Sequence, residues 1–82
     1  MKLRARWSVP AERVLKNIPR RDAERVDAAV LRFAETGQGT IERLSTDPDV
    51  TVRLHVIGYI AVLTLDRSDA TLWVGWLYRR DR

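Results

Sequence analysis

The side chains best suited to chemistry lie in the second half of the sequence. Arg53 and His55 stand two apart in an alternating segment, and Arg79 and Arg80 follow the last apolar segment. Residues two apart in a strand point to the same side of a sheet, so Arg53 and His55 should share a face. In an antiparallel sheet, we expect all four side chains to converge on one phosphate.

Such a set fits the cleavage of RNA without a metal ion. The reaction needs a base for the ribose 2′-hydroxyl, an acid for the leaving 5′-oxygen and cations for the charged phosphorane. His55 is the only histidine, and the ordinary pKa of histidine, about 6.5, suits acid–base work. Arginine binds phosphate through its planar fork. A solvated strand face with no catalytic role is the alternative explanation of the same pattern.

Tryptophans accompany these cations. Strict alternation along residues 71–78 places Trp73 and Trp76 on opposite faces of the last strand, and Trp7 lies in the first. A platform on which bases stack is one interpretation. The alternative, which we favour here, puts one tryptophan in the core and another at a partner interface.

Several other kinds of site are not expected. Four aspartates at positions 47, 49, 66 and 69 lie in two turns without the spacing of a calcium loop, so no metal site is predicted. The chain has no cysteine, which excludes disulfides and thiolate sites. No phosphate-binding loop, Ser/His/Asp order or redox motif is present, and we expect no cofactor.

Size and charge point to one small domain that has a partner. The 82 residues (1–82) allow a single modest core, which a bound protein would help to stabilise. The net charge is +4, and residues 1–25 hold eight basic and three acidic side chains, so a polyanion or an acidic protein would be attracted. No apolar stretch long enough for a signal peptide is expected at the start of the sequence, because it is interrupted by Lys2, Arg4 and Arg6. The nearly uncharged run at residues 56–65 is too short to span a bilayer. We expect a cytoplasmic protein with no membrane partner.

The apolar periodicity predicts an α+β fold. Residues 2–7 alternate as a half-buried strand does, and Ser8 and Pro10 suit the start of a helix that runs to about Asn17. After Pro19, a second helical pattern occupies residues 20–36 and ends at Gly37. Residues 41–49 are interpreted as a connection and a turn, and strands are predicted at 50–57, 59–65 and 71–78. The predicted order is β-α-α-β-β-β, a helical hairpin packed on an antiparallel sheet.

These elements, in this order, resemble the RelE/ParE family of bacterial type II toxins over nearly the whole chain. The positions that carry the resemblance in the first half are Trp7, Ala11, Leu15, Ile18-Pro19, Arg25-Val26, Gly37 to Gly39 and Leu44. A strand signature follows at Arg53-Leu54-His55-Val56-Ile57-Gly58-Tyr59-Ile60. Tyr78-Arg79-Arg80-Asp81 matches the basic segment after the last strand of members with RNase activity, with Arg79 at its key position.

The resemblance implies the toxin of a type II toxin–antitoxin pair, a metal-independent mRNA interferase that acts on ribosome-bound mRNA. It assigns catalytic roles to Arg53, His55 and Arg79, and RNA binding to Arg80, Tyr59 and Tyr78. The implied partner is a cognate acidic antitoxin, which would lie across the sheet as a helix or add a strand to its edge. Its carboxylates would pair with the arginines of the site.

Two departures from the family pattern leave other functions open. Ile60 stands where the family usually has an arginine, and the sequence stops at Arg82, before a tyrosine that often closes the active site. One alternative is a ParE-like inhibitor of DNA gyrase without enzymatic activity, which Ile60 favours. The other is a degenerate toxin that only binds its antitoxin.

Overall fold

Five strands and two helices make up the part of the chain that the computed structural model describes, residues 2–80. In chain order they are β1 (Arg4–Trp7), α1 (Val9–Asn17), α2 (Arg20–Thr36), β2 (Thr40–Ser45), β3 (Val50–Val56), β4 (Tyr59–Asp66) and β5 (Thr71–Arg79). Asp81, the last residue of the basic segment named above, and Arg82 lie outside the described residues.

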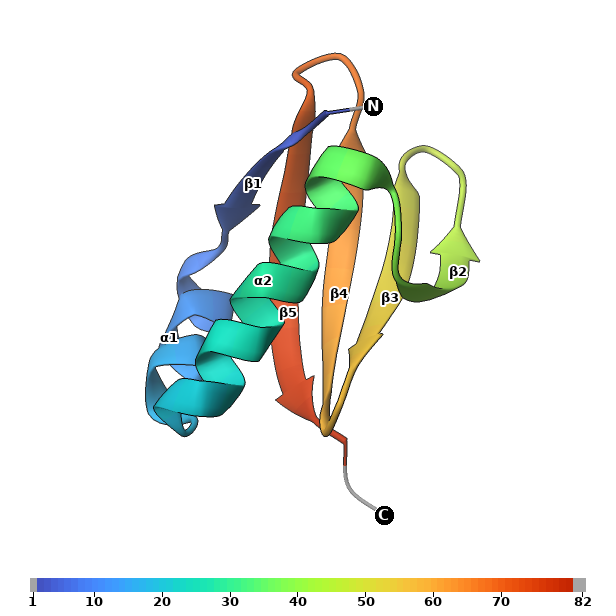
Figure 1. Cartoon of the computed structure of the whole chain (residues 1–82). Helices are drawn as coiled ribbons and strands as arrows, with labels where there is room; N and C mark the ends of the chain where they lie inside the picture. The colour runs from blue at the N-terminus through green and yellow to red at the C-terminus, as the bar shows by residue number, and fades with distance from the viewer. Residues whose placement is uncertain (1, 81–82) are drawn as a thin grey trace.

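The strands form a single sheet in the order β1-β5-β4-β3-β2 (Figure 1). Strands β2 to β5 are antiparallel neighbours, whereas β1 runs parallel to β5. Both helices lie on one side of this sheet, and no helix of residues 2–80 covers its other side (Figure 1). The predicted α+β fold is confirmed, with β2 as an additional strand at the edge.

The helices begin and end where the sequence predicts. Ser8 caps α1, since its hydroxyl accepts a hydrogen bond from the Ala11 amide at 3.2 Å. Gly37 ends α2 in a left-handed conformation, φ 76°, and its amide donates to the Phe33 carbonyl at 2.8 Å. Within residues 2–80, neither helix is long and apolar enough to cross a membrane.

The core lies between α2 and the three central strands. The apolar stripe of α2 buries Val26, Val30 and Phe33. It packs on inward-facing residues of the sheet, namely Val52, Leu54, Tyr59, Ala61, Leu63, Leu72, Val74 and Leu77. Each fully buried leucine or valine contributes about 1.5–3 kcal/mol to stability. This layer fixes which residues of β3, β4 and β5 face the helices and which face the uncovered side.

A bulge in β5 corrects the predicted placement of two tryptophans. Val62 pairs with Trp76, but Leu63 pairs with Val74, so Gly75 is an extra residue in β5. Because an extra residue reverses the alternation beyond it, Trp73 and Trp76 lie on the same face instead of opposite ones. Both are on the uncovered side, 39% and 47% exposed. The predicted opposite faces are therefore wrong, and the tryptophan that packs against the core is Trp7 on β1.

Candidate functional site

One acidic and two basic side chains meet on the uncovered face of the sheet, at its β2–β3 edge. Arg53 and His55 share this face of β3, as predicted from their spacing, and Glu42 lies opposite Arg53 on β2. The Glu42 Oε1 atom is 3.4 Å from Arg53 Nη1 and 3.6 Å from His55 Nε2. One carboxylate oxygen thus contacts both basic side chains, and Glu42, Arg53 and His55 stay open to solvent, at 53%, 40% and 27% exposed.

The ion pair with Glu42 satisfies only part of the Arg53 guanidinium. Its Nε is buried and has no hydrogen-bond partner, while Nη1 reaches Glu42. A buried donor without a partner favours the approach of an acceptor. Because Nε itself is buried, a ligand would reach the guanidinium from the solvent side of this half-exposed side chain.

Tyr78 belongs to the same face, two strands away from His55. His55 pairs with Ile60 on β4, and Ile60 pairs with Tyr78 on β5. Two strand spacings place the backbones of His55 and Tyr78 about 10 Å apart. Ile60 is only 9% exposed and is not part of the core cluster, so it fills the space between the two polar residues.

The other predicted site residues form a second group on the helix-covered side, at the end of the sheet. Tyr59 pairs with Arg79, and Tyr59 faces inward with the core. With Arg80, Asp22 and Arg25, these two residues line an open cavity of about 440 Å³. The Arg80 amide donates to the Gly58 carbonyl at 2.9 Å, which fixes the chain end beside the β3–β4 turn.

The Tyr59 hydroxyl is committed to a structural contact. It donates a 2.6 Å hydrogen bond to Asp22 Oδ2 in the first turn of α2. This hydrogen bond raises the pKa of Tyr59 above that of an ordinary tyrosine, burial raises it further, and Arg79 partly offsets both effects. Tyr59 therefore remains protonated at neutral pH and joins α2 to β4.

The sheet thus separates residues that were expected to act together. Arg53, His55 and Tyr78 lie on the uncovered face, whereas Tyr59 and Arg79 lie on the other side of the sheet. The predicted convergence of Arg79 with Arg53 and His55 on one phosphate is not found. The reason is register: Arg79 pairs with the inward-facing Tyr59, and alternation then turns Tyr78 outward.

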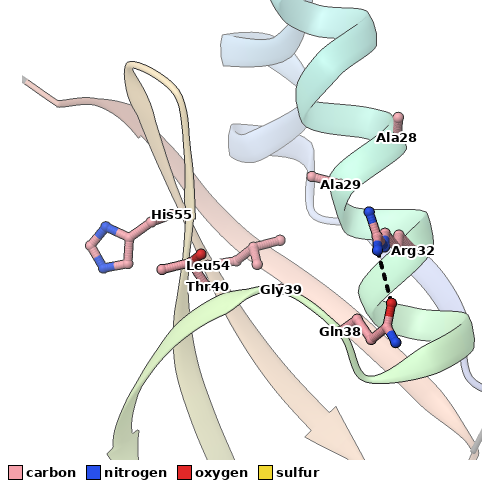
Figure 2. Close-up of a pocket in the computed structure, with 8 residues that line it drawn as sticks. All are labelled: Ala28, Ala29, Arg32, Gln38, Gly39, Thr40, Leu54 and His55. Carbon is pink, nitrogen blue, oxygen red and sulfur yellow. Dashed lines mark hydrogen bonds between the residues drawn. The ribbon is translucent and has the colours of Figure 1, made fainter.

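A groove between α2 and β3 adjoins this arrangement. Its volume is about 370 Å³, and it is lined by Ala28, Ala29, Arg32, Gln38, Gly39, Thr40, Leu54 and His55. Figure 2 shows Leu54 directed toward α2 and His55 directed away from it. Arg32 Nη2 donates to Gln38 Oε1 at 2.9 Å across the end of the groove (Figure 2). His55 therefore borders the groove, but its side chain is directed away from α2, toward the uncovered face of the sheet.

Glu42 and Asp22 are the polar partners that the sequence did not indicate. The sequence predicts a connection and a turn over residues 41–49, and the spacing of three between Ile41 and Leu44 lacks the alternation of a strand. The register shift between Arg43 and Ser45 explains that spacing. The signal that could have found the strand is the pair Thr40-Ile41, directly after Gly39 and before a turn. Among residues 2–80, no three His, Asp or Glu side chains are grouped as the ligands of a metal would be.

No known family model matches the sequence, and no curated protein matches it. The structure, however, is similar to a chain in the crystal structure of the toxin–antitoxin complex RelBE2 from Mycobacterium tuberculosis. The TM-score is 0.81 at 16% sequence identity, and the similarity covers 98% of this chain and 93% of that chain. The chain therefore has a RelE-like fold, as the resemblance of its sequence implied.

Proposed function

We propose that the chain is the toxin of a type II toxin–antitoxin pair and that it cleaves mRNA on the uncovered face of its sheet. The fold it shares with a chain of the RelBE2 complex supports the toxin role. The observation that carries the cleavage is the Glu42 carboxylate, within 3.6 Å of both His55 and Arg53 on an open surface. A base, an acid and a cation are the groups that cleavage without a metal needs.

The three side chains have distinct roles in this proposal. Glu42 takes the proton of the ribose 2′-hydroxyl, whose oxygen then attacks the adjacent phosphorus. Arg53 stabilises the charged phosphorane. Protonated His55 gives its proton to the 5′-oxygen as the bond between phosphorus and that oxygen breaks. The products are a 2′,3′-cyclic phosphate and a 5′-hydroxyl.

In this scheme, the group around Tyr59 and Arg79 on the helix-covered side binds RNA and takes no part in the reaction. Arg79 and Arg80 supply two cations beside Arg25, and Asp22 is already engaged by Tyr59. We assign this cavity to anionic groups that flank the cleaved bond, so Arg79 changes from a catalytic to a binding residue. Tyr78, on the open face, contacts the RNA near His55. Action on ribosome-bound mRNA would place the protein in the cytoplasm.

The proposed antitoxin is an acidic segment that covers the β2 edge. All of β2 except Ser45 is exposed, and Ile41 lines a cavity of about 230 Å³ with Phe33 and Val52. Arg43 and Arg67 also line that cavity. An extended segment could pair with β2, insert an apolar side chain and place carboxylates on the two arginines. Its binding should raise the melting temperature of the toxin.

Inhibition of DNA gyrase is the second candidate, and one observation favours it. Ile60, an apolar residue, fills the row between His55 and Tyr78 where a further cation would serve RNA cleavage. A degenerate toxin that only binds its antitoxin is the third. In both of these alternatives the chain keeps its fold and its antitoxin but does not cleave RNA.

Expression in growing cells, followed by mapping of mRNA ends and DNA breaks, separates the three functions. Codon-phased mRNA cuts that Glu42→Gln abolishes would support the proposal. The matched control is Glu24→Gln, which removes an exposed carboxylate paired with Arg20 on α2. Double-strand DNA breaks with intact mRNA would indicate gyrase inhibition, and normal growth would indicate a degenerate toxin.

The partner is tested separately, by co-expression with the adjacent small open reading frame and purification through a tag on one protein. The two proteins should co-purify at low salt. If they never do, and the lone chain is a stable monomer that does not harm cells, the toxin–antitoxin assignment is contradicted.

A further inference from the structure

The uncovered face of the sheet is organised in cross-strand rows that each end in an aromatic residue on β5. The first row runs from His55 through Ile60 to Tyr78, and the second from Arg53 through Val62 to Trp76. The third row runs from Thr51 through Thr64 to Trp73. Each aromatic residue is therefore two strands, about 10 Å, from a residue of β3.

The bulge at Gly75 creates this alignment. Without the extra residue, Trp73 and Trp76 would face opposite sides of the sheet. Ser8 holds the bulge in place, since its amide donates to the Val74 carbonyl and its hydroxyl to the Gly75 carbonyl, both at 2.9 Å. The cap of α1 thus also fixes the positions of the two tryptophans.

Cations lie at both sides of the tryptophans. Arg6 on β1 pairs with Trp73, and its Cζ lies 5.9 Å from the centroid of the Trp73 ring. Arg4, two residues before Arg6, lies on the same face of β1. On the far side, Arg53 faces Trp76 across Val62. Partly exposed indole rings on the uncovered face, with Arg6 over one ring and Arg53 across Val62 from the other, suit a ligand that repeats a flat ring and a negative charge.

We propose that this face binds single-stranded RNA, with bases stacked on Trp76 and Trp73 and phosphates on Arg53 and Arg6. Arg6, which lies over the Trp73 ring in the unbound chain, moves from the ring to a phosphate when a base takes its place. Base stacking on aromatic side chains tolerates any sequence, because every base has a flat π-face. This inference rests on the proposed function and deepens it by naming the residues that would hold the unpaired strand beside the cleaved bond. A paired helix cannot offer its base faces to the two indoles.

The experiment is a binding titration with a labelled 2′-O-methyl RNA strand, which lacks the attacking hydroxyl and stays intact. Trp76→Ala and Trp73→Ala should each weaken binding by about 5- to 150-fold. Trp76→Phe, which keeps an aromatic face, should retain most of the affinity. Trp76→Leu, which keeps apolar volume without that face, should not, and this pair remains informative if the alanine variant does not fold.

Leu31→Ala is the matched control. Leu31 is 45% exposed, close to the 47% of Trp76, but it lies on α2 on the other side of the molecule. The control should bind the strand as the unmodified protein does. A duplex of the same sequence should bind more weakly than the single strand.

Three results would overturn the inference. They are unchanged affinity in the tryptophan variants, equal affinity for strand and duplex, and loss of binding to the co-expressed partner while RNA affinity stays constant. The last would make the face a protein interface. Failure of the proposed function looks different: mRNA would stay intact in cells while the strand still bound through Trp73 and Trp76.

Discussion

The two sides of the sheet use similar residues for different purposes. On the helix-covered side, the carboxylate of Asp22 accepts from a tyrosine that is 4% exposed, and Arg79 lies beside them. On the uncovered side, the carboxylate of Glu42 contacts an arginine and a histidine and remains half exposed. The buried hydrogen bond between Tyr59 and Asp22 joins β4 to α2. The exposed Glu42 carboxylate, shared by Arg53 and His55, is accessible to other binding partners.

This difference predicts its largest effect at the uncovered cluster. Glu42→Gln and Arg53→Ala should each slow RNA cleavage by about 10²–10³-fold, the usual cost of losing a group that stabilises the transition state. Their free energies of unfolding should change by less than about 1 kcal/mol, because exposed ion pairs contribute little to stability. Single-turnover cleavage and denaturant titration measure the two quantities. If either variant lost as much free energy of unfolding as it lost in activation free energy of cleavage, the division between a reactive side and a structural side would be refuted.

The reverse pattern is expected at Tyr59. Tyr59→Phe removes the 2.6 Å hydrogen bond to Asp22 and should lower the free energy of unfolding by about 1–3 kcal/mol. The cleavage rate of the folded protein should not change. A loss of cleavage in a fully folded Tyr59→Phe variant would move the chemistry to the covered side.

The raised pKa of Tyr59 adds a test in alkaline solution. Because the folded protein holds this proton more tightly than the unfolded chain, the stabilisation is complete below pH ~10. It is lost as the pH rises from there through the folded pKa of Tyr59. Denaturant titrations between pH 8 and pH 11, about one unit or more on each side of the unfolded pKa, should show a steeper decline for the unmodified protein than for Tyr59→Phe. Parallel declines would contradict the assignment.

Arg79→Ala should have the smallest effect on cleavage. The side chain lies apart from Arg53 and His55, so its loss should leave the rate at saturating RNA within about tenfold of the original, far less than the loss of an oxyanion-stabilising group. If Arg79 contacts one phosphate, the slope of log affinity against log salt should fall by about 0.7. Binding titrations at several salt concentrations give this slope. A rate loss as large as that of Arg53→Ala would restore Arg79 to the catalytic group.

The sequence indicated the parts of the fold that local chemistry determines. Ser8 and Gly37 marked helix ends because caps depend on neighbouring backbone groups. The spacing of Arg53 and His55 placed them on one face because no bulge separates them. The periodicity also indicated the order of the elements, and the structural similarity to the RelBE2 chain confirms the fold.

What the sequence did not indicate depends on single extra residues. The irregular strand β2, which carries Glu42, was interpreted as a connection, and Gly75 in β5 brought Trp73 and Trp76 to one face. Each bulge reverses the alternation on which the face of every later residue depends. The side taken by Arg79 was likewise set by its pairing with Tyr59, a contact between residues distant in the sequence.

The chemistry at the RNA ends tests the central claim most directly. Purified protein is incubated with ribosomes programmed with a defined mRNA, and both new ends are identified for the unmodified chain and for Glu42→Gln. The account predicts a 2′,3′-cyclic phosphate and a 5′-hydroxyl from the unmodified protein, at a rate about 10²–10³-fold above that of the variant. Intact mRNA, other ends, or an equal rate with Glu42→Gln would contradict it.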